Sequence, residues 1–130
     1  MVEVVEVPGW SPPRPLNRAV RAGGLVFVSG HVPVDYAGDG ATAGEDIAEQ
    51  TRSVLNGVRA ALAAAGCRMS DVVSTRVLLT DIADLNGMDA VYREFFPEPF
   101  PARTTAQVSA LGRPEWRVEI DAIAVANGRE

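Results

Sequence analysis

The stretch WRVEIDAIAV (residues 116–125) decides the fold, because apolar residues alternate with other residues along most of its length. Successive side chains of a strand point to opposite faces of the sheet. One face therefore carries the apolar residues that we expect under helices: Val118, Ile120, Ala122 and Ala124. The other face carries a mixture of charged and apolar residues: Arg117, Glu119, Asp121, Ile123 and Val125. A mixed face of this kind is often covered by another subunit.

The rest of the chain predicts further strands and two helices around this strand. Apolar residues at helical spacing predict helices over about 43–65 and 84–96. Thr42 and Glu45 have capping-box spacing at the start of the first helix. Runs rich in β-branched residues predict the remaining strands: 2–7, two short strands within 19–30, 71–80 and 103–109. The order β-β-β-α-β-α-β-β predicts an α+β fold, with two helices packed on one face of one sheet.

The composition excludes several classes of chemistry. With 130 residues, of which 47% are hydrophobic and 22% charged, the chain fits one domain over residues 1–130. All 12 basic residues are arginine, which excludes a lysine Schiff base in this chain. His31 is the only histidine and Cys67 the only cysteine, so multi-histidine and cysteine-based metal sites are excluded too. We therefore expect no metal and no organic cofactor.

The charge and hydropathy of the chain predict a cytoplasmic protein. The net charge of −5 argues against binding to nucleic acid, because phosphate neutralisation needs a basic surface. No apolar run is long enough to span a bilayer, and the first ten residues lack the pattern of a secretion signal. We expect neither a membrane nor a nucleic acid among its partners.

A second stretch, FPARTTAQV (100–108), places Arg103 and Thr105 on one face of a predicted strand. If this strand pairs antiparallel with the final strand, these two residues lie on the same side as Glu119 and Asp121. A guanidinium there can hold a planar carboxylate through two hydrogen bonds, and a nearby glutamate can hold and deprotonate a water molecule. The pattern predicts a pocket for a small carboxylic acid that water attacks.

The same residues also have plain structural interpretations. Arg103 is then a solvated charge or the ion-pair partner of Glu119, and the alternating acids are the wet side of a half-buried sheet. His31 fits a loop residue better than a base, and Cys67 fits a small buried hydrophobe better than a nucleophile. The residue pattern alone leaves these alternatives open.

Several stretches together resemble the RidA/YjgF (L-PSP) family over nearly the whole chain. The most specific are FPART (100–104) and VEIDAIAV (118–125), and the others are VSGHVPVD (28–35), TRSVLNGVRAALAAAG (51–66) and DVVSTRVLLTDIADLNGMDAVYREFF (71–96). The resemblance implies a chorismate-mutase-like fold, with a six-stranded, mainly antiparallel sheet and two helices on one face. It also implies a homotrimer in which the open sheet faces line the centre and the sites lie in clefts between subunits.

Proteins of this family hydrolyse reactive enamine and imine intermediates, such as 2-aminoacrylate and 2-iminobutanoate, to 2-oxo acids and ammonia. By position, the resemblance implies that Arg103 binds the substrate carboxylate and that Glu119 positions the attacking water. Gly30 matches a glycine whose backbone contacts the ligand, and Thr105 occupies a position that is cysteine in many members. The implied function is the hydrolytic deamination of a small imine that bears a carboxylate.

Several positions depart from the family pattern. The family's GPYSQA motif is replaced by RPLNRA (14–19), so Leu16 replaces a tyrosine and Arg18 replaces a glutamine. His31 stands where glutamine is common, and Asp89 where asparagine is common. The carboxylate anchor and the water-binding carboxylate are retained, whereas the substrate-side wall is changed. Two alternatives are a related hydrolase with a different substrate and a non-catalytic trimer that senses 2-oxo acids.

Overall fold

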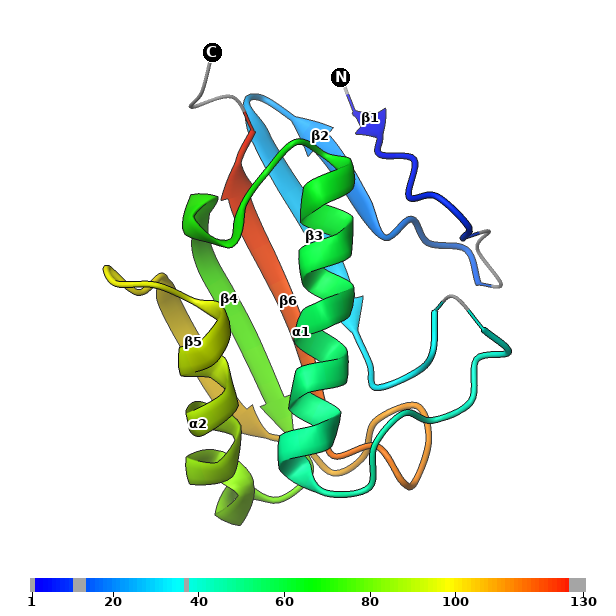
Figure 1. The fold of residues 1–130 in the computed structure, drawn as a ribbon, viewed down its shortest axis with the longest axis vertical. Coiled ribbons are helices and arrows are strands. Elements are labelled where there is room, and N and C mark those ends of the chain that lie inside the picture. The colour runs from blue at the N-terminus through cyan, green and yellow to red at the C-terminus, as the bar shows by residue number, and fades with distance from the viewer. Residues whose placement is uncertain (1, 11–13, 37, 127–130) are drawn as a thin grey trace.

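A six-stranded sheet forms one layer of the molecule, and two helices form the other (Figure 1). The computed structural model describes residues 2–10, 14–36 and 38–126. The strands are β1 (Glu3–Val4), β2 (Ala19–Ala22), β3 (Leu25–His31), β4 (Val72–Leu79), β5 (Ala102–Gln107) and β6 (Val118–Val125), and the helices are α1 (Ile47–Ala64) and α2 (Leu85–Phe95). Both helices cover the same face of the sheet, which confirms the predicted α+β architecture.

The strands lie in the order β1-β2-β3-β6-β4-β5, and all neighbours are antiparallel except β4 and β5. The parallel pair arises because α2 connects β4 to β5, and such a crossover returns the chain in its original direction. The chain then crosses β4 to reach β6, so β5 forms one edge of the sheet. The last two strands of the sequence are therefore not neighbours.

Helix α1 begins four residues later than predicted. Asp46 is its N-cap, with Oδ1 accepting from the backbone N–H of Glu49 at 2.8 Å, while Glu49 Oε1 accepts from the N–H of Asp46 at 3.3 Å. The predicted capping box of Thr42 and Glu45 is wrong, although its spacing is the same. Thr42 instead forms an isolated bridge with Val34, which keeps this segment extended.

The core lies between the sheet and the helices. The predicted inner face of β6 is buried, with every member at most 2% exposed: Val118, Ile120, Ala122 and Ala124. Helix α1 packs Val54, Leu55, Val58 and Leu62 against it. Among the described residues, no helix is long and apolar enough to cross a membrane.

Within residues 2–10, 14–36 and 38–126, no helix lies on the opposite face of the sheet (Figure 1). Phe27 of β3 is 39% exposed on this face, where it pairs in register with Ile123 of β6. Nearby, Arg76 Nη2 forms an ion pair with Asp121 Oδ2 at 2.8 Å. We call this mixed apolar and charged surface the open face.

Candidate active site

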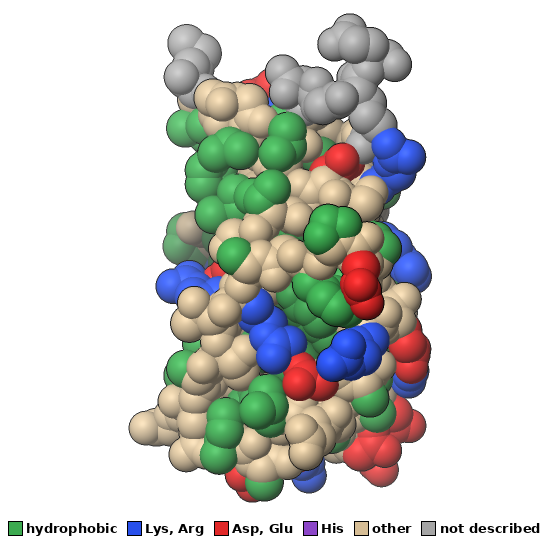
Figure 2. All heavy atoms as spheres, turned by 90° about the vertical axis from the view of Figure 1, so that its left-hand side faces the viewer, with side chains coloured by type: hydrophobic (Ala, Val, Ile, Leu, Met, Phe, Trp, Pro, Cys, Tyr) green, Lys and Arg blue, Asp and Glu red, His purple; other side chains and the backbone are tan. Residues whose placement is uncertain are grey.

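A pocket of about 210 Å³ lies at the β5 edge of the sheet, between this strand and α2. Its lining comes from one face of α2 and from the segment that enters β5: Asp89, Tyr92, Arg93, Phe100, Pro101 and Arg103. Figure 2 views the molecule from this side and shows basic and acidic side chains gathered around an apolar hollow. Apolar walls with a few charged groups are typical of small-molecule sites.

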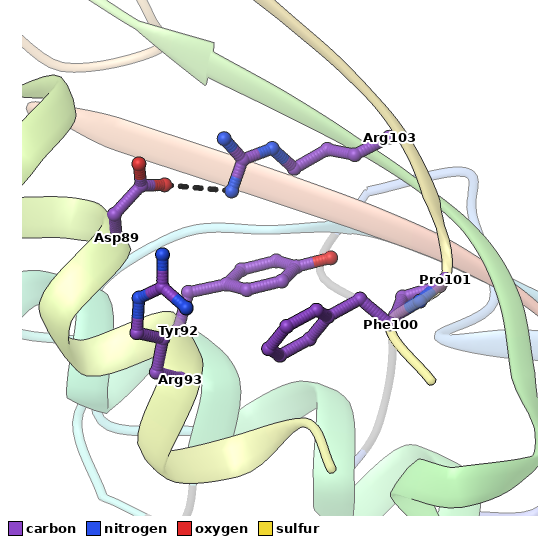
Figure 3. Close-up of a pocket in the computed structure, with 6 residues that line it drawn as sticks. All are labelled: Asp89, Tyr92, Arg93, Phe100, Pro101 and Arg103. Atoms are coloured by element: carbon purple, nitrogen blue, oxygen red, sulfur yellow. Dashed lines mark hydrogen bonds and ion pairs between the residues drawn. The ribbon is translucent and has the colours of Figure 1, made fainter. Parts of the chain in front are cut away.

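Arg103 is held in this pocket by two contacts (Figure 3). Its Nη1 donates to Asp89 Oδ1 at 2.7 Å, and its guanidinium carbon lies 4.9 Å from the centre of the Tyr92 ring. The Tyr92 hydroxyl is in turn hydrogen-bonded to the Thr75 hydroxyl at 2.8 Å, which fixes the ring. Burial raises the pKa of Tyr92, so the ring remains a neutral phenol at physiological pH.

One edge of the Arg103 guanidinium is available to a ligand. The side chain is 26% exposed, and its Nε and Nη2 donate to none of the described residues. These two nitrogens form the fork that binds a planar carboxylate through two parallel hydrogen bonds. The arrangement can therefore hold a small carboxylic acid without displacing Asp89.

Glu119 lies on the open face of β6, close to Gly30 of β3. A Cβ atom at position 30 would come within 2.9 Å of the Glu119 Cδ, so a larger residue would force the carboxylate to move. The register between β3 and β6 shifts between Val28 and His31, and such a bulge re-aims the residues within it. Close approach to the Glu119 carboxylate therefore explains the glycine at position 30.

The electrostatic surroundings of Glu119 favour its protonated form. Burial is the main cause that raises its pKa, and the neighbouring Asp121 adds to the shift, while Arg76 opposes it. Glu119 forms no ion pair with any described residue, because Arg76 is bound to Asp121 instead. A carboxylate with a raised pKa is a stronger base than an exposed glutamate, and this suits proton abstraction from water.

Register-paired residues on neighbouring strands point to the same face of a sheet. Thr75 of β4 pairs with Arg103 of β5 and is buried on the helix side. Leu78, three residues further along β4, pairs with Glu119 of β6 on the other side. Arg103 and Glu119 therefore lie on opposite faces of the sheet.

The prediction that Arg103, Thr105, Glu119 and Asp121 lie on the same side is thus wrong. It assumed direct pairing of the last two strands, whereas β4 lies between them and β5 runs parallel to β4. Arg103 and Thr105 are on the helix side, and Glu119 and Asp121 are on the open face. The interpretation of Arg103 as an ion-pair partner of Glu119 in the same chain is also wrong, because that partner is Asp89.

His31 is buried at the end of β3 and not in a loop as expected. Its Nε2 accepts from Arg18 Nε at 3.1 Å, so the ring proton lies on Nδ1, which donates to the Ser29 carbonyl at 2.8 Å. Burial lowers the pKa of His31 to about 4. The neutral ring has no free lone pair and is no candidate for a general base. Arg18 also donates to the Gly57 carbonyl at 2.9 Å and stacks 4.4 Å from the Tyr36 ring.

The sequence interpretation missed most of the pocket wall. It treated Asp89 only as a departure from the family pattern and did not place Tyr92 in the site. The available signal was their spacing, because residues 89, 92 and 93 share one face of a helix. Phe100 could not be placed from the sequence, since the path of the loop before β5 follows no periodicity. Cys67 is buried, as its interpretation as a small hydrophobe predicted.

Comparison with known proteins gives consistent matches over most of the chain. The family described as Endoribonuclease L-PSP matches residues 10–126. A RutC family protein of Pyrococcus horikoshii, PH0854, is 40% identical over 113 residues, covering 87% of this chain and 88% of that protein. The human 2-iminobutanoate/2-iminopropanoate deaminase is 36% identical, covering 85% and 80%. The crystal structure of Escherichia coli TdcF with bound serine matches with a TM-score of 0.85 and 32% identity, covering 95% and 98%.

Proposed function

The chain belongs to the endoribonuclease L-PSP (RidA/YjgF) family, and we propose that it hydrolyses 2-imino acids, such as 2-iminobutanoate, to 2-oxo acids and ammonia. The observation that carries the proposal is the Arg103 guanidinium, which lines a small pocket with its carboxylate-binding edge free. The raised pKa of Glu119 supplies a base, and the human relative carries the name of an imine deaminase.

We further propose that the working unit is a homotrimer with sites shared between subunits. One copy cannot bring Arg103 and Glu119 to the same ligand, because the sheet separates them. A second copy can do so if its open face lies against the pocket edge of the first. Three copies arranged head to tail close a ring with three identical sites, and their apolar side chains on the open face, such as Phe27, are covered.

In such a site, each predicted residue has a distinct part in the reaction. Arg103 binds the substrate carboxylate through Nε and Nη2 and so fixes the imine carbon. Glu119 of the neighbouring copy holds a water molecule and takes its proton as the oxygen attacks that carbon. Gly30 lets the substrate approach the backbone beside this carboxylate, and Thr105 lines the wall on the Arg103 side.

These groups account for each proton that is transferred in the reaction. Water adds to the C=N bond of the protonated imine to give a tetrahedral aminoalcohol, and Glu119 receives the water proton. Glu119 then returns that proton to the nitrogen. The C–N bond breaks as the hydroxyl oxygen forms the carbonyl, and the hydroxyl proton passes to Glu119 and from there to the departing ammonia. The products are one 2-oxo acid and ammonia, which leaves protonated.

The separation of Arg103 from Glu119 also supports a second candidate, a protein that binds 2-oxo acids without catalysis. Binding needs only the free guanidinium edge, which one copy already contains. The two candidates differ in what Glu119 does. Catalysis requires its carboxylate, whereas simple binding does not.

A coupled assay with threonine dehydratase separates the two candidates. The dehydratase releases 2-iminobutanoate, and the measured quantity is the rate of 2-oxobutanoate formation with and without this protein. We expect the wild type to accelerate formation and Glu119→Gln to lose roughly 10²–10⁴-fold of that acceleration. Glu94→Gln is a matched control, because Glu94 is paired with Arg52 on the outer surface of the helices. Equal rates with and without the wild-type protein would contradict the enzymatic proposal.

A further inference from the structure

Asp89 places a carboxylate inside the pocket, directly beside the guanidinium that binds the ligand. Its Oδ1 accepts from Arg103 Nη1 at 2.7 Å, and its Oδ2 accepts from none of the described residues. The side chain is 30% exposed, and its carboxylate is turned toward the Arg103 guanidinium, which lies over the Tyr92 ring (Figure 3). A ligand in the pocket therefore meets an available anion as well as an available cation.

The two groups are arranged side by side without cancelling each other's hydrogen-bonding capacity. Because Asp89 occupies only Nη1, Arg103 keeps its Nε–Nη2 edge for a carboxylate. The free Oδ2 of Asp89 can accept from a positively charged nitrogen on the neighbouring carbon of the same ligand. This pattern complements a zwitterion in which a carboxylate and a nitrogen cation are joined through one carbon.

A carboxylic acid that carries no cationic group interacts less favourably with this pocket than a zwitterion does. Its carboxylate is attracted by Arg103 but repelled by Asp89, and no part of it compensates for the repulsion. Arg93 also lines the pocket, over the Phe100 ring at 5.7 Å, and forms no ion pair with any described residue. Among the described residues, the pocket lining therefore holds two guanidiniums and one carboxylate, that of Asp89.

We propose that Asp89 makes this pocket selective for zwitterionic 2-amino and protonated 2-imino acids over the corresponding 2-oxo or 2-hydroxy acids. This inference rests on the proposed function and names the charge state of its substrate. In the reaction, Asp89 stabilises the protonated imine, which is the form that water attacks. After ammonia leaves, the 2-oxo acid has no cation for Asp89 and is repelled, so Asp89 also favours product release.

The test uses two unreactive ligands with the same carbon skeleton, 2-aminobutanoate and 2-hydroxybutanoate. The measured quantity is the dissociation constant of each ligand, by calorimetry or ligand-observed NMR, for the full-length wild type, Asp89→Asn and Glu94→Gln. The asparagine keeps an oxygen that accepts from Arg103, so the pocket retains its shape. Glu94→Gln removes one carboxylate from the same helix, outside the pocket.

We expect the wild type and Glu94→Gln to bind the amino acid about fivefold more tightly than the hydroxy acid, a factor typical of one partly exposed ion pair. Asp89→Asn should lose this preference and bind the hydroxy acid more tightly than the wild type does. The inference is overturned if Asp89→Asn leaves the ratio of the two constants unchanged. It is also overturned if the wild type prefers the hydroxy acid or binds neither ligand.

The deaminase assay distinguishes failure of this inference from failure of the proposed function. An active wild type whose ligand preference does not depend on Asp89 would overturn the inference alone. A wild type without deaminase activity that still loses its preference in Asp89→Asn would support zwitterion recognition by a binding protein. That result would contradict the proposed deaminase reaction and support the proposed role of Asp89 in ligand selectivity.

Discussion

Arg103 and Glu119 lie on opposite faces of one sheet, with β4 between their strands. Each has an environment suited to one half of a hydrolysis, since Arg103 presents a free donor edge and Glu119 has a raised pKa. Neither residue can bind the substrate and activate the water by itself. The arrangement explains why a site that uses both residues needs a second copy of the chain.

The oligomeric state is the first property to measure. We expect light scattering to give about 41 kDa, three times the 13.8 kDa of one chain. Phe27→Glu should shift the mass toward that of one chain, because it places a charge on the open face, which the proposed trimer covers. Ala60→Glu, on the exposed side of α1, should leave the trimer intact. A wild type that stays monomeric at micromolar concentration would rule out the shared site.

Substitution of Arg103 tests the carboxylate anchor. Arg103→Ala should lose about 2–4 kcal/mol of ligand binding, because two charge-assisted hydrogen bonds disappear. Arg103→Lys should recover little, since an ammonium group cannot reproduce the fork. Arg52→Ala removes a surface guanidinium on α1 and serves as the control. Unchanged steady-state kinetics in a folded Arg103→Ala trimer would contradict the assignment.

Gly30→Ala tests the close approach of β3 to Glu119. The added Cβ should push the carboxylate from its position, so kcat should fall more than KM rises. Thermal unfolding should change less than the rate, because the carboxylate can rotate toward solvent. A variant with wild-type kcat would show that the position of this carboxylate does not matter for the reaction.

The buried pair of Arg18 and His31 predicts a pH dependence of stability. The folded-state pKa of His31 is about 4, below the ordinary 6.5, so the unfolded chain binds a proton more readily. The neutral His31 ring therefore favours the folded state fully above pH 6.5. As the pH falls from 6.5 to 4, the free energy of unfolding should decrease by about 3 kcal/mol. Urea unfolding of the wild type and His31→Gln at several pH values measures it. Identical pH profiles for the two proteins would refute the prediction.

The local parts of the structure could be predicted from the sequence, and the long-range parts could not. Alternation in residues 118–125 correctly separated the core face of β6 from the open face, because that period depends on one strand alone. The face to which Arg103 points depends on which strand lies beside β5, and the crossover through α2 determines this. Arg18 and His31 meet across 13 residues of sequence, and no local pattern indicates that contact.

Mixed trimers provide the most direct test of the shared site. Arg103→Ala and Glu119→Gln should each be inactive alone, since every site of either trimer lacks one essential group. In a trimer that contains both variants, one of the sites joins an intact Arg103 to an intact Glu119 of its neighbour. Refolding the two variants together in equal amounts should therefore restore about a quarter of the wild-type deaminase rate. Mixed trimers that form but stay as inactive as their parents would contradict the account.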